Sequence, residues 1–521
     1  MDERPTPEAL LRSVFGHAAF RPGQRELIGA VLAGRDAIGV MPTGAGKSLA
    51  YQLPARLLGG TTLVVSPLIA LMKDQVDALL RRGVRATFLN SSLGPAERRA
   101  RVLAIRRGEL ELVYAAPEGL EAAAGGALSG ARLSLIAVDE AHCISHWGHD
   151  FRPAYRNLSG LKERFRGVPV LALTATATRR VSADVAQQLA MREPFEYRGS
   201  FYRPNLRLQA VKKGGEAGVR SREAILRHLA SRPGESGIVY CATRKAAEGL
   251  AADLRGHGVR ALAYHAGLDV EVRERAQDAF QGGAATVIVA TIAFGMGIDK
   301  PDIRYVIHRD MPGSIEGYCQ EIGRAGRDGG PSDCILFFSW ADVMTHDRFA
   351  GQVEDQEVAA RQRQQARGMF RWAEAAGCRH ALLVRHFDER IAACGSSCDR
   401  CAPRPLAQGP VGRARTTRPR RMDPLAPGRP GPGGAEREPA PAAGPGDAEL
   451  FERLRALRRR LAGARGVPAY LVFHDSTLLA IAASRPASEV ALQAIPGLGP
   501  RPLADYGAEV LAVVQGARAG R

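Results

Sequence analysis

The sequence predicts an α/β protein with two doubly wound parallel-sheet domains in tandem, because one alternation of strand and helix patterns occurs twice. Between residues 35 and 210, short apolar runs rich in β-branched residues alternate with amphipathic stretches, and the pattern repeats between 205 and 340. Near-continuous apolar runs are typical of parallel strands that helices cover on both faces. The expected strands are RDAIGVM, TTLVVSP, LELVYAA, LSLIAVDE and VPVLALTA in the first domain, and NLRLQAV, SGIVYCAT, RALAYHA, ATVIVAT, RYVIHRD and CILFFS in the second.

The rest of the chain divides into three further segments, as its length of 521 residues leads us to expect. Residues 341–403 have a helical pattern and end in a cysteine cluster. Residues 404–446 are dominated by Pro, Gly, Ala and Arg and cannot bury enough apolar surface to fold, so they predict a disordered basic linker. We expect two α/β domains at 1–204 and 205–340, and a small all-α domain at 447–521. One apolar helical face supports this last domain and consists of Leu450, Phe451, Leu454, Leu457 and Leu461.

The formal net charge of +18 comes mostly from arginine, whose planar guanidinium suits phosphate oxygens. Such an excess favours polyanionic partners, although a GC-rich genome that encodes Arg in place of Lys is an alternative explanation. No apolar run reaches the roughly 18 residues that a membrane span needs. The acidic N-terminal segment MDERPTPEALL lacks a signal-peptide core, so we expect a protein of the bacterial cytosol or nucleoid with no membrane partner.

The eight cysteines do not have the spacing of a secreted disulfide framework. Cys143, Cys241, Cys319 and Cys334 stand alone within expected strands or helices, and we interpret them as small core residues.

A candidate P-loop, Met41-Pro-Thr-Gly-Ala-Gly-Lys-Ser48, follows an expected strand and precedes an expected helix. Its glycines allow backbone N–H groups to approach phosphates, and the helix N-terminus favours an anion. Lys47 would pair with the β- and γ-phosphates of ATP, and Ser48 would hold Mg²⁺. Met41 stands where the usual pattern has its first glycine, and a glycine-rich turn without a ligand is the alternative. The expected nucleotide contacts are Thr43, Gly44, Ala45, Gly46, Lys47 and Ser48.

Two acids follow the apolar strand in LSLIAVDEAH, at the carboxyl end where parallel sheets bind ligands. Asp139 would hold Mg²⁺ directly or through water, and Glu140 would orient and deprotonate the attacking water. A solvated acidic turn is the alternative, but it is weakened by the P-loop that precedes it in the same domain.

The second domain lacks a P-loop but ends with Gln320-Glu-Ile-Gly-Arg-Ala-Gly-Arg-Asp328. Arg324 and Arg327 are three residues apart, so on a helix they would share a face. Directed at a nucleotide in the first domain, they would neutralise the charge that develops on the γ-phosphate. Taken alone, this pair would be better explained as two surface arginines.

Together these segments resemble a superfamily 2 helicase, with two RecA-like domains, and are similar to the RecQ family. The resemblance covers residues 10–403 and roughly the last 75. Phe15-Gly-His17 and Phe20-Arg-Pro-Gly-Gln24 resemble the family's adenine-recognition segment. The resemblance implies that Gln24 reads the adenine edge, that Arg21 lies against its face, and that His17 replaces the family's usual tyrosine.

The sequence Asp139-Glu-Ala-His-Cys-Ile-Ser-His-Trp-Gly-His-Asp-Phe-Arg-Pro153 resembles the family's aromatic-rich loop. Aromatic rings stack on unpaired bases and arginine contacts phosphate. Core packing is the alternative reading of the aromatic residues, but the polar residues around them are unsuited to a core. The expected nucleic-acid contacts in this loop are His146, Trp147, His149, Phe151 and Arg152.

Further motifs extend the resemblance along both domains. Ala172-Leu-Thr-Ala-Thr-Ala177 resembles the motif that couples hydrolysis to strand movement, and an ordinary strand end is the alternative. The resemblance implies that Thr174 and Thr176 supply hydroxyls that contact the nucleic acid. In the second domain, YCATR, YHAG and ATIAFGMGIDKP resemble motifs that grip the DNA backbone and sense the nucleotide.

Four cysteines resemble the family's zinc module, namely Cys378, Cys394, Cys398 and Cys401. Four thiolates suffice for tetrahedral Zn²⁺ in a structural site. Three residues separate Cys394 from Cys398, where the family more often has two. His380 and His386 are nearby alternative ligands, and an iron–sulfur cluster is the rival cofactor.

One departure from the family is the space between the cysteine cluster and the C-terminal helical domain. Family members usually carry a winged-helix domain there, which binds duplex and often supplies the wedge that parts the strands. Residues 404–446 are too short and too rich in proline for that domain, although their arginines could hold duplex through its phosphates. Residues 447–521 resemble the HRDC domain, whose arginines are either an auxiliary DNA contact or a solvated helix face.

The resemblance thus implies a DNA helicase that uses Mg-ATP to move 3′ to 5′ on single-stranded DNA and unwinds tailed or forked duplex in repair and recombination. We expect it to act as a monomer, with single-strand-binding or other repair proteins as further partners. A translocase or annealing protein with weak strand separation is one alternative. An RNA helicase is another, since the DEAH residues alone permit it.

Overall fold

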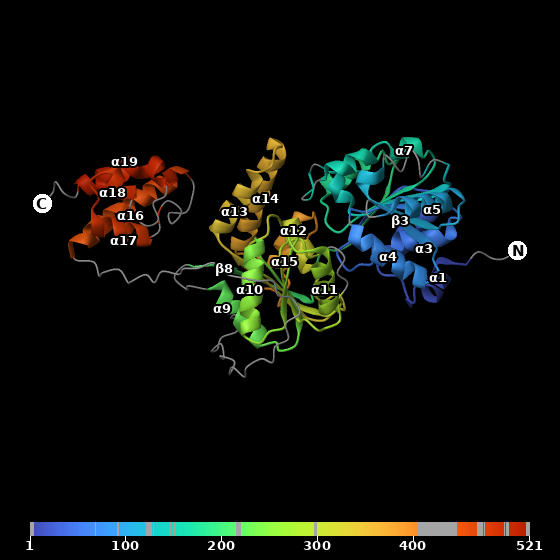
Figure 1. Ribbon diagram of the computed structural model, residues 1–521, viewed down its shortest axis with the longest axis horizontal. Coiled ribbons are helices and arrows are strands. Elements are labelled where there is room, and N and C mark those ends of the chain that lie inside the picture. Colours follow the sequence, from blue (N-terminus) through green and yellow to red (C-terminus); the bar gives the residue numbers. More distant parts are fainter. Residues whose placement is uncertain are drawn as a thin grey trace. The chain divides into compact units, whose positions relative to one another are not determined.

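The computed structural model describes residues 5–67, 69–90, 93–120, 128, 130–145, 147–148, 150, 152–214, 220–295, 300–403, 445–465, 473, 475–493, 495 and 500–516. The chain forms two compact units, Met1–Thr417 and Arg418–Arg521. The first unit contains two sheets and a helical region, and the second contains helices (Figure 1). The predicted fold class is confirmed.

Lobe 1, which runs from α1 to β7, is built on a seven-stranded sheet in the order β3-β4-β2-β5-β6-β1-β7 with all neighbours parallel. Its strands are β1 (Ala37–Val40), β2 (Thr61–Val65), β3 (Ala86–Leu89), β4 (Leu112–Ala115), β5 (Leu133–Val138), β6 (Val170–Thr174) and β7 (Phe195–Arg198). Its helices are α1 (Pro7–Ser13), α2 (Gln24–Leu32), α3 (Leu49–Leu57), α4 (Ile69–Arg81), α5 (Pro95–Arg106), α7 (Leu161–Arg164) and α8 (Arg179–Gln188), with 3₁₀ turns η1 (Pro117–Gly119), η3 (Ala141–Ile144) and η4 (Pro153–Leu158).

Two hydrophobic clusters cover the two faces of this sheet. One contains Leu27 of α2, Tyr51 of α3 and Val76 of α4, and the other contains Ile105 of α5 and Val181 of α8. The sequence missed β3 and β7, which are four-residue strands at the two edges. An edge strand is covered on fewer sides, so its sequence does not need the continuous apolar run of a central strand.

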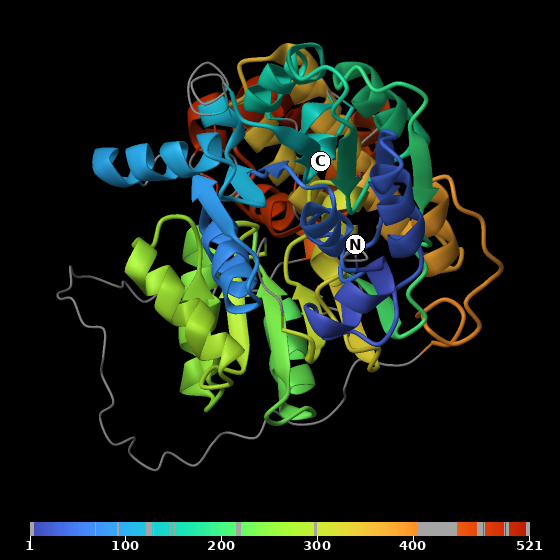
Figure 2. The ribbon, with the colours of Figure 1, turned by 90° about the vertical axis from the view of Figure 1, so that its right-hand side faces the viewer.

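Lobe 2, which runs from β8 to β13, is a six-stranded parallel sheet in the order β10-β11-β9-β12-β13-β8. Its core clusters place α9 and α10 on one face and α11 and α12 on the other, and Figure 2 shows helices flanking the strands. The strands are β8 (Leu206–Lys212), β9 (Ser236–Tyr240), β10 (Ala261–Tyr264), β11 (Val287–Ala290), β12 (Ile303–His308) and β13 (Ser332–Phe338). The helices are α9 (Ser221–Ala230), α10 (Arg244–Gly256), α11 (Val270–Gln281) and α12 (Ile315–Ile322).

A cysteine module, residues 340–401, continues the first unit with α13 (Trp340–Ala350), α14 (Gln356–Glu374) and α15 (Arg379–His386). A capping box begins α13, because Ser339 accepts from the helix backbone and Asp342 accepts from Ser339 N. The module shares a continuous hydrophobic cluster with both lobes, to which it contributes Met369, Phe387 and Cys398.

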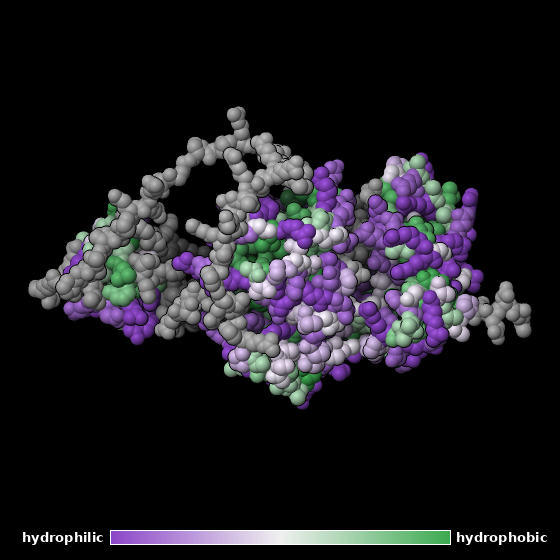
Figure 3. Space-filling view, turned by 90° about the horizontal axis from the view of Figure 1, so that it is seen from below, coloured by the Kyte–Doolittle hydropathy of each residue, from purple (hydrophilic) through white to green (hydrophobic). Residues whose placement is uncertain are grey.

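The second unit contains α16 (Pro445–Arg465), α17 (Asp475–Ser484), α18 (Glu489–Gln493) and α19 (Pro500–Gly516) around a core of their own. Most of the expected linker, 404–444, lies outside the described residues. In Figure 3 the described surface is dominated by hydrophilic residues, with apolar ones in scattered groups. None of the helices in the described ranges has both the length and the apolar character needed to cross a membrane.

Candidate nucleotide and nucleic-acid site

The candidate P-loop connects β1 to the N-terminus of α3, as the sequence predicts. Gly44 and Gly46 have φ angles of 88° and 76°, a region that suits glycine because it has no Cβ. Met41, the departure from the usual pattern, is fully buried in the core of lobe 1, and its N–H donates to Thr174 O at 2.9 Å. The missing glycine is therefore a position where a side chain packs without disturbing the loop.

The segment that resembles the adenine-recognition motif contacts the P-loop directly. Gln24 is buried, and its amide donates to the carbonyls of Ala45 at 3.2 Å and Gly46 at 2.9 Å. Arg21 donates to Gly44 O, and its backbone N–H donates to Gln24 Oε1 at 2.8 Å. His17 is exposed. Gln24 therefore bonds to the phosphate loop in this structure, and its role in reading adenine stays a prediction.

Asp139 and Glu140 follow β5 and form the acidic side of the site. Burial and the neighbouring Glu140 charge raise the pKa of Asp139 to about 7, while Lys47 acts in the opposite direction. Two adjacent acids in such a place are suited to a divalent cation, which would restore the charged form of the carboxylate. Asp139 and the Ser48 hydroxyl at the start of α3 are oxygen donors of the kind Mg²⁺ prefers, so the donor set fits that ion.

Glu140 has an unusual backbone conformation, with φ 47° and ψ 44°. A non-glycine residue in the left-handed region is strained, and such strain is concentrated at functional sites. Its Oε2 atom is buried and accepts no hydrogen bond within the described part of the chain, although His142 Nδ1 lies 3.4 Å away. A buried acceptor of this kind is available to a water molecule or a substrate.

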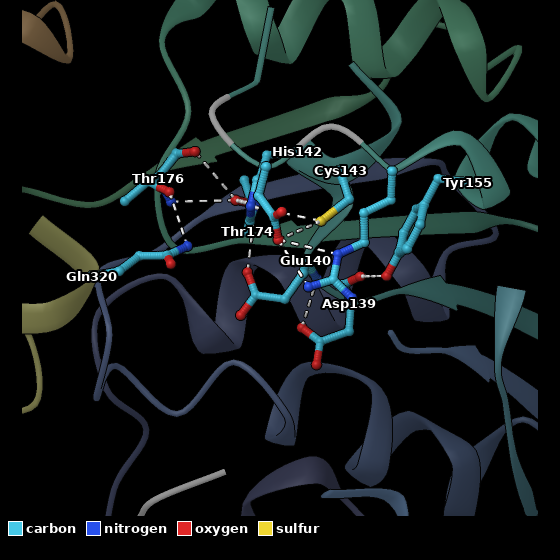
Figure 4. A network of polar contacts seen from close by, with 10 residues as sticks. Asp139, Glu140, His142, Cys143, Tyr155, Thr174, Thr176 and Gln320 are labelled. Carbon is cyan, nitrogen blue, oxygen red and sulfur yellow. Dashed lines mark hydrogen bonds and ion pairs between the residues drawn. The ribbon is translucent and has the colours of Figure 1, made fainter. Parts of the chain in front are cut away.

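A polar network leads from this acid to lobe 2 (Figure 4). His142 Nδ1 lies 2.8 Å from Thr174 Oγ1, and Thr176 N donates to that same hydroxyl at 3.2 Å. Gln320 of α12 then donates to Thr176 Oγ1 at 3.3 Å. Both threonines are 2% exposed. Their hydroxyls are buried within this network, which suits a coupling role, and their expected contact with nucleic acid stays a prediction.

Arg327 lies against the P-loop. A Cβ atom at Gly44 would be 3.3 Å from Arg327 Cγ, so the arginine stem covers the glycine of the phosphate loop. Gly323 brings the end of α12 equally close, because a Cβ there would be 2.9 Å from Thr43 Cβ. Lobe 2 therefore contacts the phosphate loop through the side-chain stem of Arg327, and the γ-phosphate finger role of its guanidinium stays a prediction.

Arg324 has a different environment from the one predicted. Helix α12 ends at Ile322, so the two arginines do not share a helical face. Arg324 is 7% exposed and its guanidinium packs against Gly295 within lobe 2, near Tyr240 and Glu321. The prediction that the two arginines share a helical face was wrong, and we expect only Arg327 to face the nucleotide.

The sequence did not single out Arg203, which lies between the lobes. Its guanidinium donates to Gly326 O at 2.7 Å and Ala325 O at 3.1 Å, and it approaches Thr43 O at 3.5 Å. It thus joins the P-loop to the segment that carries Arg327. Its position at the boundary between the two α/β patterns is the one signal that the sequence offers.

Within the aromatic-rich loop, the structure describes Trp147, Asp150 and Arg152, whereas His146, His149 and Phe151 lie outside the described residues. Trp147 is 44% exposed, as a base-stacking residue must be. Arg152 donates to Asp150 Oδ2 at 2.9 and 3.1 Å, so its phosphate contact, which stays a prediction, would compete with this pair.

The four predicted zinc ligands converge. All four sulfur atoms lie within 4.8 Å of one another, and Cys398 Sγ is 4.0 Å from Cys378 Sγ. Tetrahedral zinc with Zn–S bonds of about 2.3 Å would place sulfurs ~3.8 Å apart, so the cluster fits Zn²⁺. Burial opposes ionisation of Cys378, but backbone N–H donors at Ala381 and Cys394 outweigh it and lower its pKa to about 7.

Both histidines near the cluster have other partners. His380 Nε2 lies 3.0 Å from Leu206 O and 3.1 Å from Ser397 O, and His386 Nε2 lies 2.7 Å from Glu316 Oε1. The cysteines therefore form the candidate site without a histidine. The cysteine loop also pairs with β8, since Leu208 N donates to Ser397 O at 3.0 Å.

A short segment from His386, the last residue of α15, to Glu389 contacts both lobes and the connection between them, and the contact with lobe 2 is the pair of His386 with Glu316 of α12. Phe387 stacks on Phe201 with ring centroids 4.1 Å apart, and Glu389 accepts from Ser200 Oγ at 2.5 Å and Phe201 N at 2.7 Å. Asp388 accepts from Arg179 N, the first residue of α8, at 2.8 Å. We call residues 386–389 the hinge clamp. No motif in the sequence indicated it.

Comparison with protein families and known structures places the two lobes among the helicases. The chain matches the family models described as DEAD/DEAH box helicase over residues 21–185 and helicase conserved C-terminal domain over 221–329. It also matches RecQ zinc-binding over 340–402 and HRDC domain over 447–514. The *Mycobacterium smegmatis* helicase Lhr bound to ssDNA and AMP-PNP has the same fold, with a TM-score of 0.51 and 22% identity over 71% of this chain and 58% of that one.

Two curated relatives then define the family. The *Bacillus subtilis* ATP-dependent DNA helicase RecQ is 35% identical over 585 positions that cover 98% of both chains. The *Haemophilus influenzae* ATP-dependent DNA helicase RecQ is 44% identical over 406 residues, which are 77% of this chain and 64% of that protein. This chain belongs to the RecQ family. It spans less than two thirds of the length of the *Haemophilus influenzae* relative.

Proposed function

We propose that this chain is an ATP-hydrolysing DNA helicase that translocates 3′ to 5′ on single-stranded DNA and unwinds tailed or forked duplex. The observation that carries the proposal is the packing of Arg327 from lobe 2 against Gly44 in the P-loop of lobe 1. A motor needs this arrangement, because a nucleotide between two lobes can hold them together only when both contact its phosphates. Membership in the RecQ family makes DNA the expected polymer.

Each polar group near the P-loop has a separate task in this proposal. Lys47 and the N–H groups of the P-loop would bind the phosphates of ATP. Ser48 and Asp139 would hold Mg²⁺, which neutralises phosphate charge when it is bound. Glu140 would accept a hydrogen bond and then a proton from the attacking water, and Arg327 would stabilise charge on the γ-phosphate.

The polar network described above would transmit the state of this site to lobe 2. A change in the charge or position of Glu140 would act on His142, which lies next to it. The two buried threonine hydroxyls extend the contact from His142 to Gln320 on α12. Lobe closure on ATP and opening after hydrolysis would then move the strand that the lobes hold.

The test is unwinding of a labelled duplex with a 3′ single-stranded tail, measured beside DNA-stimulated ATP hydrolysis. We expect both activities in the wild-type protein and neither in Lys47→Ala, which should still bind single-stranded DNA. Equal stimulation by RNA of the same sequence would contradict the choice of DNA.

We further propose a monomer of the bacterial cytosol that works with single-strand-binding or other repair proteins.

A second candidate is a DNA-stimulated translocase or annealing protein with weak strand separation. The alignment with the *Bacillus subtilis* relative has 585 positions, more than the 521 residues of this chain, so at least 64 of them lie opposite gaps in this chain. The zinc-binding and HRDC matches are separated only by residues 403–446. Hydrolysis without unwinding in the tailed-duplex assay would favour this candidate.

A further inference from the structure

A second cluster of metal-binding side chains lies in lobe 1, next to the acids that follow β5. His142, Cys143 and Asp150 each offer one ligand atom, and these three atoms lie within 4.8 Å of one another. Cys143 Sγ is 3.7 Å from His142 Nε2 (Figure 4). The same sulfur is 3.9 Å from Asp150 Oδ2. The sequence indicated a core role for Cys143 and no ligand role for the other two residues.

The ligand atoms of this cluster and their spacing fit Zn²⁺. Zinc is a borderline-soft ion that accepts imidazole nitrogen, thiolate sulfur and carboxylate oxygen. With Zn–S bonds of about 2.3 Å and Zn–N or Zn–O bonds of about 2.1 Å, tetrahedral angles place the sulfur ~3.6 Å from each of the other two atoms. The observed separations of 3.7 and 3.9 Å are close to this spacing. Three protein ligands leave the fourth position to water.

His142 is held in the orientation that a ligand needs. Its Nδ1 atom lies 2.8 Å from Thr174 Oγ1 and 3.4 Å from Glu140 Oε2, and its Nε2 atom faces the sulfur of Cys143. A metal-binding histidine typically has a polar partner at its second ring nitrogen, because that partner fixes the ring. His142 and Cys143 are both buried, so the two ligands are fixed by the surrounding core.

Asp150 gives the cluster access to solvent. Its side chain is 43% exposed and lines a cavity of about 500 Å³, through which an ion can reach the two buried ligands. Arg152 donates to Asp150 Oδ2 at 2.9 Å and therefore competes with a cation for this carboxylate. A site with three ligands and such a competitor should bind zinc more weakly than the four cysteines do, so we expect it to fill only when free zinc is supplied.

We propose that His142, Cys143 and Asp150 form a regulatory zinc site, and that a bound Zn²⁺ slows DNA-stimulated ATP turnover. The thiolate is the ligand, so the proton of the Cys143 thiol passes to solvent when zinc binds. The ion would join η3, which directly follows Glu140, to the aromatic-rich loop that carries Asp150. That loop could then no longer move independently of the acids. The zinc site stands on its own geometry, whereas the inhibitory effect rests on the proposed function.

The first test is a calorimetric titration of Zn²⁺ into the full-length protein whose cysteine module already holds zinc. The wild-type protein should bind one further ion per chain. Cys143→Ala and Asp150→Asn should each weaken this binding at least about a hundredfold, because even the loss of an outer partner of a ligand costs 10- to 100-fold. Cys241→Ala removes another buried lone cysteine, in lobe 2, and is the matched control that should bind as the wild type does.

Two further measurements identify the ligands and the fold. Added Co²⁺ should give a cobalt–thiolate absorption band in the wild type and in Cys241→Ala, but not in Cys143→Ala. Added zinc should raise the midpoint of thermal unfolding of the wild type, because a ligand that binds only the folded state stabilises it. Asp150→Asn changes a partly exposed residue and should unfold like the wild type without added zinc, and added zinc should no longer stabilise it.

The activity test measures DNA-stimulated ATP turnover with and without added zinc. Turnover should fall in the wild type and stay constant in Asp150→Asn. Absence of a further bound ion in the wild type, or equal binding by the wild type and Cys143→Ala, would overturn the site. Bound zinc with unchanged turnover would overturn its inhibitory effect. If the wild type shows no DNA-stimulated turnover even without zinc, the proposed function fails, whereas the binding titration still decides whether the site exists.

Discussion

Gln320 donates a hydrogen bond to the hydroxyl of Thr176 over 3.3 Å, although the two residues belong to different lobes and are 144 positions apart in the chain. Thr176 is 2% exposed and is connected to His142 through Thr174 (Figure 4). The contact joins the start of the arginine-bearing segment of lobe 2 to the acids that follow β5. It is therefore the point at which the two halves of a motor could sense each other.

The first prediction concerns this contact. Gln320→Ala should lower DNA-stimulated ATP turnover roughly fivefold, because one net hydrogen bond is worth about 1 kcal/mol. The affinity for a fluorescent ATP analogue should stay the same, since Gln320 does not contact the P-loop among the described interactions. The exposed Gln364→Ala is the control. Wild-type turnover in Gln320→Ala would remove this hydrogen bond from the coupling.

The second prediction separates the two arginines of the QEIGRAGRD segment. Arg327→Ala should reduce ATP turnover by about a thousandfold, in the range of other arginine fingers, with little effect on thermal unfolding. Arg324→Ala should instead lower the free energy of unfolding by about 1–3 kcal/mol, because its buried partners lose a donor. Both variants are to be compared by steady-state kinetics and thermal melts. If Arg324→Ala loses ATP turnover without a change in the free energy of unfolding, Arg324 acts at the nucleotide site after all.

The third prediction uses the narrow space between the lobes. In Gly323→Ala, the new methyl would lie 2.9 Å from Thr43 Cβ and 3.2 Å from Thr43 Oγ1, so the lobes must separate or the P-loop must shift. We expect a loss of ATP turnover while single-stranded DNA binding remains. Gly368→Ala on α14 has nothing within 4 Å of its new methyl and should be neutral or slightly stabilising. Similar activity in both variants would show that the lobes do not need this contact.

The sequence predicted the central strands well, because buried parallel strands have continuous apolar runs, and all six strands of lobe 2 were expected. It missed β3 and β7, whose edge positions relax that pattern. It located the P-loop and the DEAH acids from local motifs. It placed Arg324 on a helix because it continued the helical pattern through Gly323, the C-cap glycine directly after which α12 ends. The contact of Glu389 could not be predicted for a different reason. Its partner Phe201 lies 188 residues away, and only the fold brings the two residues together.

The fourth prediction concerns the four cysteines. Metal analysis of the purified protein should give zinc at one atom per chain and no iron or visible absorbance, which would exclude the iron–sulfur alternative. A chelator should lower the midpoint of thermal unfolding, because the loop around Cys398 pairs with β8 and loses its anchor without metal. Cys401→Ser should have a lower midpoint that no longer responds to chelator. Cys334→Ser, in the core of lobe 2, should keep its zinc.

The fifth prediction concerns the hinge clamp. Both carboxylate oxygens of Glu389 accept hydrogen bonds from the connection between the lobes, one from Ser200 Oγ and one from Phe201 N. In Glu389→Ala, the N–H of Phe201 loses its acceptor, and we expect a cost of about 1–3 kcal/mol in unfolding free energy. We also expect the ratio of DNA-stimulated to basal ATP turnover to fall, because a loosened connection transmits lobe motion less well.

Glu389→Gln separates these two effects. Its amide oxygen can still accept from Phe201 N, and its NH₂ group can donate to the Ser200 hydroxyl, so geometry is retained while the charge is lost. This variant should recover most of the turnover ratio, and the exposed Glu354→Ala should match wild type throughout. If Glu389→Ala unfolds at a lower temperature but keeps the wild-type ratio of DNA-stimulated to basal turnover, the hinge clamp only holds the cysteine module in place. If Glu389→Ala lowers the ratio and Glu389→Gln restores it, the cysteine module couples ATP hydrolysis to the motion of the lobes.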